Sequence, residues 1–564
     1  MDWCPSIAFA LCLVAFSCIL LCLYKHFFWD PSSISLSLLR AGLPVLPYSP
    51  VIGSVAHLKR VRDAVASVVL QSPSDHDIAP LALPFYSRTH LQIGIPFVYW
   101  WGTQPRLVVC DPDDIKQILS TKFKDYKKSD VTSKFLSRIL GIGLLTSEGE
   151  DWHNQRQIIR HAFFQEKLNG MVDIMASCAL KMMKEWQNIV EKEGGQAELE
   201  VAHHIKDTMA DIIARTSFGS SYEKGKAVFE KQAELVELMM QDVVANSTIP
   251  GYKYIPTPMN LRCWKLERII ENELKEIVEA RRRAANTPRS SSPSSSTVPE
   301  GEVSVFDENA GKILRLEKDL LGWMLPSEEQ VDRLGMMKLN TRQVVDECKT
   351  FFFAGYETTS HLLAWSVVLL AHYSDWQERS RQEVLHLHME EGQPLSSHHL
   401  SKLKILGTIL YEVLRLYPPV PELSPRVEDS KNLERLHLKS LNGMRVPKGM
   451  SFAVPVLILH RDKELWGEDA NEFRPERFNE GVTKACKHPC GYLPFAFGPR
   501  TCIGQNFALM EAKVVLATLL RHFRFQLSPN YMHAPVTSLT LRPRYGVRII
   551  LESLTNLEAT RDLS

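Results

Sequence analysis

The chain has 564 residues, of which 45% are hydrophobic, and its 66 Lys and Arg against 65 Asp and Glu give a formal net charge of +1. This balance leaves no basic footprint of the kind that nucleic-acid-binding proteins carry, so we predict no nucleic-acid partner. The 11 cysteines are odd in number and irregularly spaced, which excludes a regular disulfide framework and fits a reducing compartment.

An apolar segment lies at the start of the chain. Residues 7–23 carry no charge and are followed by Lys25 and His26. Such a run is at the short end of a membrane-spanning helix and lacks a clear small-residue cleavage site, so residues 1–29 are predicted to be an uncleaved membrane anchor. Because positive charge follows the apolar run, the rest of the chain is predicted to be cytoplasmic. A cleaved secretory signal is the alternative.

Helical periodicity dominates the rest of the sequence, and no internal repeat is apparent. Short β-rich stretches occur near 97–109, 450–458 and 539–551, so we expect a mainly α fold with a small β portion.

The proline-containing segment 30–53 is predicted to be a stiff hinge after the anchor. Residues 285–301 are rich in Ser and Pro and are predicted to be a disordered surface insertion.

Basic residues gather in two parts of the sequence. Trp152 and Arg156 are four residues apart in a predicted helix, so their donors share one face; an amphipathic helix with a core tryptophan is the alternative. Arg160 follows in the same segment, and Lys484 and Lys487 lie much later. These residues could frame a positive face for an acidic electron donor, although a solvated helix face explains them equally well.

The segment Ala354 to Thr359 lies between two apolar runs and is predicted to be the middle of a long buried helix. Its glycine and threonines are expected to weaken the helix and open its hydrogen-bond ladder. Glu357 and Thr358 form an acid–alcohol pair that could relay protons. A kink with solvated polar side chains is the alternative.

A second helix is predicted over residues 405–416, beginning near a cap at Ser401. Glu412 and Arg415 lie three apart on it and therefore share a face. Alone, this pair is ordinary surface charge. The Pro-Glu-Arg-Phe segment that contains Arg477 lies between this helix and a later cysteine loop, which makes a structural role plausible.

The loop from Phe495 to Gly504 places Cys502 close to glycines, an aromatic ring and Arg500. A thiolate needs nearby positive charge or a metal, so Cys502 is predicted to be the axial sulfur ligand of a haem iron. The glycines would let backbone N–H groups approach the sulfur, Phe495 would shield it, and Arg500 could pair with a haem propionate. The alternative is a buried cysteine in a turn.

Another cysteine pair, Cys486 and Cys490, has the spacing C-x-x-x-C. Zinc sites usually combine two such pairs, or one pair with two histidines, so this single pair is weak evidence for a metal. We therefore predict an ordinary loop there.

The pattern F-x-x-G-x-R-x-C-x-G around Cys502 resembles the haem-binding motif of the cytochrome P-450 family. The resemblance implies a cytochrome P-450 fold, mainly α with a small β subdomain, in one catalytic domain over residues 54–564 with haem b as cofactor. It also implies that Arg477 locks the pair Glu412 and Arg415. The residues that it assigns to haem binding are Trp152, Arg156, Arg426, Phe495, Arg500, Cys502 and Gly504.

The same resemblance implies a monooxygenase that uses O2 and electrons from NADPH-cytochrome P-450 reductase, at the endoplasmic reticulum membrane. Relatives that rearrange peroxides without oxygen tend to lack the pair that Glu357 and Thr358 form here. A non-oxygenating isomerase or a haem-thiolate binding protein remains the alternative.

These motifs do not identify the substrate. Segments such as 210–226 and 533–547 look like those of a plant clan of membrane-bound cytochromes P-450, with cytokinin trans-hydroxylases the closest resemblance. A small hydrophobic substrate is expected; the clan also includes hydroxylases of fatty acids, gibberellins and steroids. Tyr356 departs from the His or Gln expected there. Glu422 is predicted either to face the substrate or to be exposed to solvent.

Overall fold

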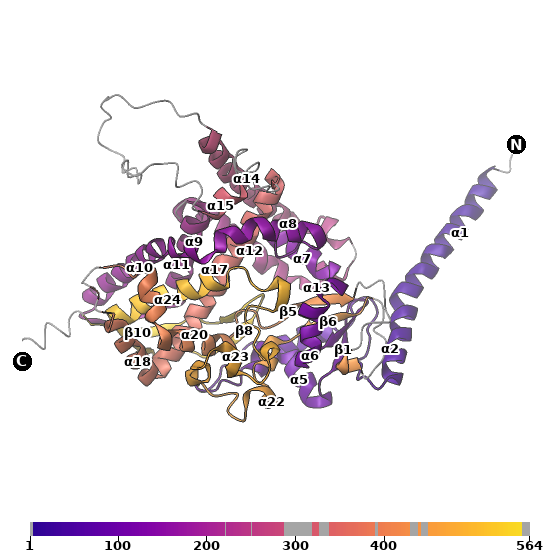
Figure 1. Ribbon diagram of the computed structural model, residues 1–564. Coiled ribbons are helices and arrows are strands. Elements are labelled where there is room, and N and C mark those ends of the chain that lie inside the picture. Colours follow the sequence, from indigo (N-terminus) through magenta and orange to yellow (C-terminus); the bar gives the residue numbers. More distant parts are fainter. Residues whose placement is uncertain are drawn as a thin grey trace, which may run out of the picture.

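The computed structural model describes residues 4–219, 222–249, 251–286, 319–325, 338–387, 389, 393–428, 438–441 and 449–554. Helices dominate, as predicted (Figure 1). The predicted insertion at 285–301 lies outside the described residues from residue 287 onward. The α-helices are α1 (Cys4–Tyr24), α2 (Asp30–Arg40), α3 (Val55–Ala64), α4 (Ala79–Ala82), α5 (Pro84–Ile93), α6 (Pro112–Lys116), α7 (Asp130–Leu140), α8 (Gly149–Ile159), α9 (Gln165–Asn169), α10 (Val172–Lys192), α11 (Val201–Phe218), α12 (Tyr222–Gln241), α13 (Val243–Thr248), α14 (Pro258–Asn286), α15 (Leu320–Met324), α17 (Thr341–His372), α18 (Ser374–Leu385), α19 (Ser397–Lys402), α20 (Lys404–Leu416), α21 (Val456–Leu459), α22 (Lys463–Trp466), α23 (Val482–Ala485) and α24 (Gln505–His522).

The β structure is small, and three sheets contain all of its named strands in the described residues. A five-stranded sheet has the order β1-β2-β6-β5-β3, a three-stranded sheet the order β4-β10-β7, and β8 pairs with β9. The three predicted β-rich stretches contain β1, β2, β6, β9 and β10. The strands are β1 (Phe97–Trp101), β2 (Gln104–Val108), β3 (Tyr126–Lys128), β4 (Gln196–Glu200), β5 (Leu423–Glu428), β6 (Ser451–Val454), β7 (Phe523–Leu527), β8 (Pro535–Thr537), β9 (Leu541–Pro543) and β10 (Arg548–Ser553).

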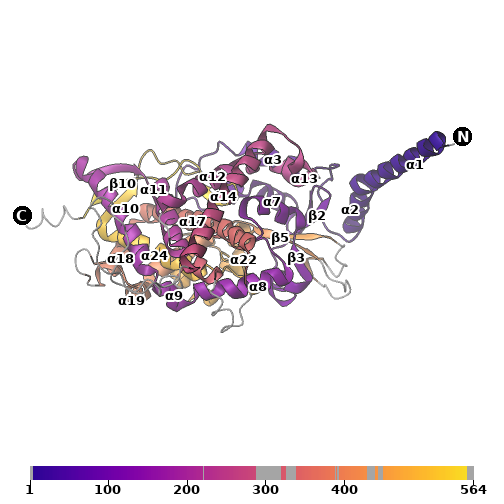
Figure 2. The same ribbon diagram turned by 90° about the horizontal axis from the view of Figure 1, so that it is seen from above.

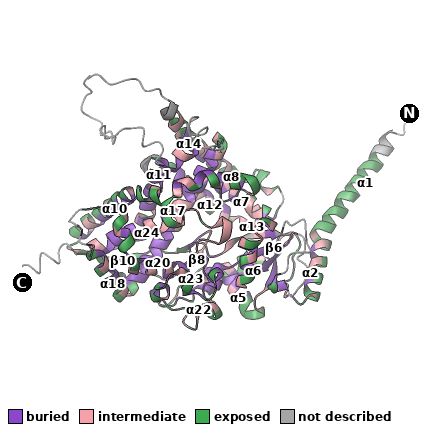
Figure 3. Ribbon diagram, in the orientation of Figure 1, coloured by how far each residue is buried: buried purple, intermediate pink, exposed green. Residues whose placement is uncertain are grey.

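The N-terminal helix projects from the body of the molecule (Figures 1 and 2), and its apolar side chains are exposed (Figure 3). Within the described residues, one helical stretch, Phe9–Arg40, is long and apolar enough to cross a membrane, a test that a signal sequence near the N-terminus also passes. This stretch continues through a π-helical turn at Lys25–Trp29 into α2. The first eleven residues of the predicted hinge are therefore helical.

The rest of the predicted hinge lies against the β1 edge of the five-stranded sheet. The Val98 N–H donates to the Pro44 carbonyl at 2.8 Å, and the Leu46 N–H donates to the Val98 carbonyl at 2.8 Å. Leu38 and Leu43 are buried in the apolar cluster beneath this sheet. These contacts tie the segment after the N-terminal helix to the folded body.

Helix α17 runs through the middle of the molecule (Figure 1). Apolar residues lie on most of its sides, as expected for a helix that other helices cover. Asn340 and Gln343 form a capping box at its start. Gly355 allows α11 to approach closely, because a Cβ there would lie 2.5 Å from Ile213 Cδ1. Contrary to the predicted opening, α17 is helical without interruption. The Thr358 and Thr359 hydroxyls find acceptors one turn earlier within the helix, so they need no opened ladder to be satisfied.

Helix α20 begins at Lys404, and the predicted cap at Ser401 is wrong. Ser401 lies in the last turn of α19 instead. The cap comes from another helix: the Glu383 carboxylate of α18 accepts the N–H groups of residues 404, 405 and 406 at 2.7, 2.7 and 3.0 Å. A carboxylate at a helix N-terminus also interacts favourably with the helix dipole.

Candidate functional site

The Cys502 loop is shaped by backbone contacts. The Cys502 N–H donates to the Phe495 carbonyl at 2.9 Å, and α24 begins directly after Gly504. Gly498 adopts φ +75°, and a Cβ there would lie only 2.3 Å from the Leu119 carbonyl oxygen. Only glycine meets both conditions without strain. Gly498 therefore serves the close approach of the Leu119 segment rather than the sulfur.

Opposing influences act on the Cys502 thiol. Burial raises its pKa, while the Gly504 N–H and the charge of Arg156 lower it. The side chain nevertheless is exposed, unlike the other described cysteines outside α1. A thiol that protein atoms surround and that still has accessible surface borders a space inside the molecule. Metal coordination would deprotonate such a thiol outright.

Part of α17 faces this loop across that space. Phe163 stacks on Phe351 of α17 with ring centroids 5.7 Å apart, and its Cε1 lies 3.9 Å from where a Gly504 Cβ would be. On a helix, Ala354 and Thr358 share the side of Phe351. Both are partly exposed in a helix whose flanking turns are buried. The Cys502 loop and this side of α17 therefore border one space.

A basic cluster, Lys128, Arg156, Arg426 and Arg500, lies beside the loop. Arg500 donates to the Ser147 carbonyl at 3.1 Å, pairs with the Glu148 carboxylate and lies 4.3 Å from the Trp152 ring centroid. The other three members contact the cysteine loop or the residues that precede α8.

Arg156 donates to the Thr501 carbonyl at 2.8 Å, Arg426 lies 3.8 Å from Glu148 Oε1, and the Lys128 ammonium donates to the Leu145 carbonyl.

Charge in this cluster is unbalanced, since Glu148 is the only carboxylate that pairs with its members in the described residues. Burial, followed by the neighbouring arginines, lowers the pKa of Lys128 well below its ordinary value. Burial likewise lowers the pKa of Arg500 to about 10. Buried like charges are costly without counter-charges. Two further carboxylates, such as the propionates of haem b, would supply them. With a sulfur donor at the neighbouring internal space, the residues present therefore fit haem b.

Glu412 and Arg415 are both fully buried and form a bidentate pair with two distances of 2.7 Å. Arg415 also donates to the carbonyls of His460, Ala470 and Glu472. Arg477 Nε lies 3.5 Å from Glu412 Oε1. The three charged side chains thus meet in space, and they join α20 to the segment that leads to the Cys502 loop.

The acid and the alcohol on α17 have different partners. The Thr358 hydroxyl donates to the Ala354 carbonyl at 2.9 Å. The Glu357 carboxylate lies 3.3 Å from Lys206 Nζ and 3.9 Å from His361 Nε2. Burial would raise the pKa of Glu357, but His361, Lys206 and Arg542 together lower it below its ordinary value. Glu357 is therefore ionised at neutral pH.

Glu422 is neither fully exposed nor free. Its Oε1 accepts the Tyr86 hydroxyl at 2.7 Å, and Tyr86 also pairs with the Tyr99 hydroxyl at 2.8 Å. Burial raises the pKa of Glu422. The prediction of a solvent-exposed Glu422 is therefore wrong. The residue is partly buried, and the hydroxyl of a buried tyrosine satisfies one of its carboxylate oxygens.

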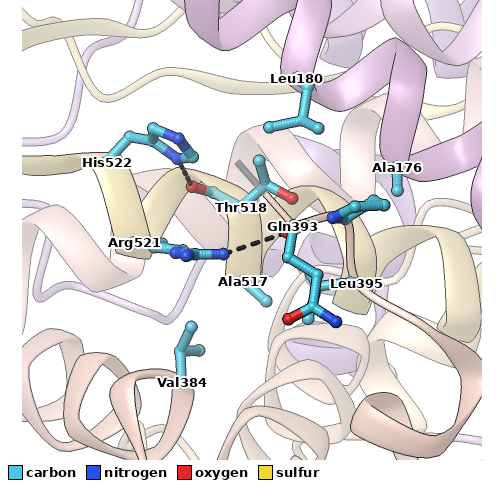
Figure 4. A pocket seen from close by; sticks show the side chains of 10 residues that line it. Ala176, Leu180, Val384, Gln393, Leu395, Ala517, Thr518, Arg521 and His522 are labelled. Atoms are coloured by element: carbon cyan, nitrogen blue, oxygen red, sulfur yellow. Dashed lines mark hydrogen bonds between the residues drawn. The ribbon is translucent and has the colours of Figure 1, made fainter. Parts of the chain in front are cut away.

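The structure supports no metal role for the other cysteine pair. Cys486 and Cys490 are buried, burial raises the pKa of both thiols, and the described residues contain no group of three metal-ligating side chains. Arg160, Lys484 and Lys487 are exposed, whereas Arg156 turns inward. A small pocket between α10, α18 and α24 contains none of the predicted site residues (Figure 4).

Sequence reasoning missed Lys128 and Glu148. Lys128 lies in β3 and Glu148 precedes α8, and neither stands in a recognisable motif. The Lys128 N–H donates to Glu148 Oε1 at 3.1 Å. No local pattern signals this contact, since it depends on strand pairing that brings β3 and Arg426 of β5 together.

Hydrogen bonds also connect α17 to the segment that precedes Glu148. Glu347, which is fully buried, accepts the Leu144 N–H at 3.0 Å through Oε2, while its Oε1 has no hydrogen-bond partner among the described residues. Thr350 donates to the Leu140 carbonyl at 2.9 Å. Burial raises the pKa of Glu347 to about 8. The carboxyl group is therefore mostly protonated at neutral pH.

Glu347→Gln should flatten the pH dependence of stability. Between pH 4.5 and 8 the native chain keeps a proton that the unfolded chain releases, so the stability of the natural chain falls as pH rises. The amide has no such proton. Its stability relative to the natural chain should rise by roughly 3 kcal/mol from pH 5 to pH 8 in urea unfolding. Glu185→Gln, at an exposed position on α10, is the control; parallel pH profiles for Glu347→Gln and the natural chain would contradict the assignment.

Comparison with known proteins gives several matches. A family model described as "Cytochrome P450" matches residues 85–549. The chain is 37% identical over 528 residues to "Cytochrome P450 72A13" of Arabidopsis thaliana, covering 93% of this chain and 94% of the relative. It is 36% identical over 530 residues to "Cytochrome P450 734A1" of the same plant, covering 94% of each. Among solved structures, "Retinoic acid bound cyanobacterial CYP120A1" matches in fold with a TM-score of 0.69 and 23% identity, covering 91% of this chain and all of that one.

Proposed function

As a member of the cytochrome P-450 family, this chain is a haem-thiolate monooxygenase, and we propose that it hydroxylates a small hydrophobic plant hormone or terpenoid, with cytokinins as the first class to test. The observation that carries the site assignment is the apposition of the Cys502 loop, the basic cluster and the Phe351, Ala354 and Thr358 side of α17. The plant origin of the relatives supports the substrate class.

Each part of the site has a task in this proposal. Haem b supplies, when bound, an iron centre that binds and activates dioxygen. Cys502 would donate its thiolate to the iron, and the basic cluster would hold the two propionates. Gly504 borders the sulfur, since a Cβ there would lie 4.0 Å from Cys502 Sγ. Phe495, whose carbonyl accepts the Cys502 N–H, would limit the contact of the sulfur with water. Glu357 and Thr358 supply protons on the opposite side.

The proton path joins two neighbouring residues. Thr358 can turn its hydroxyl from the Ala354 carbonyl toward the internal space and give its proton there. Glu357 is ionised at rest, so it would first take a proton from water and then pass that proton to the Thr358 oxygen. Retention of both residues favours oxygenation over isomerisation or simple ligand binding, which are the second candidates for this chain.

The proposed setting is the endoplasmic reticulum membrane. The N-terminal helix supports a single-pass anchor with the catalytic domain in the cytoplasm. NADPH-cytochrome P-450 reductase is the proposed electron donor. The exposed Arg160, Lys484 and Lys487 are candidate contacts for its acidic surface.

The test uses microsomes that contain this chain and the reductase, supplied with NADPH and a panel of cytokinins, gibberellins, steroids, terpenoids and fatty acids. We expect products that gain one oxygen atom, read by mass. Thr358→Ala should bind haem normally but lower product formed per NADPH on the order of 10²-fold, as loss of a positioned proton donor does. Thr359→Ala is the matched control, because Thr359 also donates to a helix carbonyl but faces Glu511 of α24. Full coupling in Thr358→Ala would refute the relay.

A further inference from the structure

Glu422, in the turn between α20 and β5, has one occupied and one free carboxylate oxygen. Its Oε1 accepts the Tyr86 hydroxyl at 2.7 Å. Its Oε2 takes part in no hydrogen bond among the described residues, and it is not one of the buried oxygens that lack a partner there. Oε2 therefore keeps accessible surface and is available to a ligand.

A chain of hydrogen-bond donors holds this carboxylate. Tyr86 has a single hydroxyl proton, which it gives to Glu422, so its 2.8 Å contact with the Tyr99 hydroxyl must use the Tyr99 proton. Burial raises the pKa of Tyr99, and the Arg106 guanidinium opposes this through its charge and a hydrogen bond. Because a guanidinium can only donate, the chain runs in one direction, from Arg106 to Glu422.

The same groups favour the ionised form of the carboxylate. Burial raises the pKa of Glu422, while the Tyr86 hydrogen bond and the Arg106 charge lower it. An ionised carboxylate accepts hydrogen bonds and donates none. Oε2 would therefore attract an N–H or O–H group and repel another carboxylate.

The free oxygen borders a space inside the molecule. Val420 and Glu422 are partly exposed, although Pro421 between them is buried. Burial is nevertheless the main influence on the Glu422 carboxyl, as it is on the Cys502 thiol. A carboxylate that protein atoms surround and that still has accessible surface faces an internal space rather than bulk solvent.

Contacts place this turn beside α17. The Leu541 N–H of β9 donates to the Pro419 carbonyl at 3.0 Å, and the Leu541 carbonyl accepts the Trp365 indole N–H at 3.2 Å. Trp365 lies about two helical turns beyond Thr358 on α17. On its other side the turn continues into β5, which carries Arg426 of the basic cluster. The turn therefore lies between α17 and the basic cluster, which both border the proposed site.

We propose that Glu422 Oε2 binds an N–H or O–H group of the substrate, so that this chain selects ligands with a hydrogen-bond donor and rejects carboxylic acids of similar size. The inference rests on the proposed hydroxylase function and narrows its substrate class. Cytokinins, which carry N–H groups, and terpenoid alcohols meet this requirement. Fatty acids and gibberellins do not, because their carboxylates would face that of Glu422.

The experiment measures ligand binding to the purified holoenzyme without turnover. The probes are N-alkylimidazoles that end in an amine, an alcohol or a carboxylic acid, each in a series of increasing chain length. Their imidazole coordinates the haem iron and shifts the Soret band, so every probe reports its own Kd. At the chain length that reaches Oε2, the amine should bind at least about tenfold more tightly than the acid, with the alcohol between them.

Glu422→Gln is the decisive variant. The amide can still accept the Tyr86 hydroxyl through its carbonyl, but it presents an N–H donor to the internal space. The Kd of the amine should rise about tenfold, and that of the acid should fall. Tyr86→Phe breaks the same hydrogen bond and keeps the carboxylate, so it should still prefer the amine. Glu185→Gln, at an exposed position, should bind all probes as the natural chain does.

Two results would overturn the inference. One is an amine-to-acid ratio of Kd values that Glu422→Gln leaves unchanged, and the other is an equal loss of preference in Glu422→Gln and Tyr86→Phe, which would assign the effect to packing. Either result, with oxygenated products from the substrate panel, leaves the proposed function standing. A ratio that depends on Glu422 without any oxygenated product would instead overturn the proposed function and leave the Glu422 contact in place.

Discussion

Replacing Arg415 by alanine should give a chain that takes up no haem. Glu412 would be left as a fully buried carboxylate without its bidentate partner, and three backbone carbonyls would lose their donor. Breaking a buried pair by removing one partner costs about 3–5 kcal/mol, because the remaining charge is uncompensated. This cost falls on the contact between α20 and the segment that precedes the Cys502 loop. The measurement is haem content per chain, by absorbance, together with the urea unfolding midpoint.

A second variant of Arg415 tests whether the shape of its side chain matters as well as its charge, and an exposed arginine provides the control. Arg415→Lys keeps the charge but cannot reproduce the planar fork that serves two carboxylate oxygens and the carbonyls, so it should also fail. Arg379→Ala removes an exposed ion pair with Glu476 and should change stability by less than about 1 kcal/mol. Folded, haem-loaded Arg415→Ala protein would show that the triad is dispensable.

Local patterns predicted the parts of the site that lie within one element or one loop. The α17 segment is recognisable because two apolar runs flank Glu357 and Thr358, and the Cys502 loop because its glycines and Arg500 are adjacent in sequence. Both depend on contacts within a few residues. The sequence therefore predicted the long buried helix, while the roles of Glu357, Thr358 and Cys502 stay proposals.

Parts that depend on distant contacts were not predictable in this way. Glu383 caps α20 from a neighbouring helix, and no nearby residue indicates it. Lys128 and Glu148 join the basic cluster only because β3 pairs with β5. Their side chains carry no pattern that distinguishes them from surface charges. The charge imbalance that supports haem binding is thus visible only in three dimensions.

Glu422 illustrates the same limit at the level of one side chain. Its position in the turn after the helix that carries Glu412 suggested either a ligand contact or exposure, since carboxylates are rarely buried alone. Tyr86 lies 336 positions away in sequence and supplies the partner that makes partial burial acceptable. Neither alternative included this partner, because nothing near Glu422 in sequence indicates it.

Cys502→Ser should remove the thiolate ligand of the haem iron without destabilising the folded chain. The serine keeps the size and backbone contacts of the loop, and the basic cluster still offers its cations to the propionates. Serine lacks a thiolate, so the reduced protein with carbon monoxide should lose the red-shifted Soret band that thiolate ligation gives, and monooxygenase activity should become undetectable. The urea unfolding midpoint of the haem-free chain should stay near that of the natural chain, in contrast to Arg415→Ala.

The control for this variant is Cys110→Ser, at a partly exposed cysteine whose pKa burial raises. It should keep the thiolate band unchanged. If Cys502→Ser kept that band, another cysteine would have to be the ligand. The described candidates outside α1 are buried or only partly exposed, whereas Cys502 is exposed to the internal space that α17 borders. A retained band would therefore require a haem position away from Phe351 and Thr358, and with it a different proton path from the one that Glu357 provides.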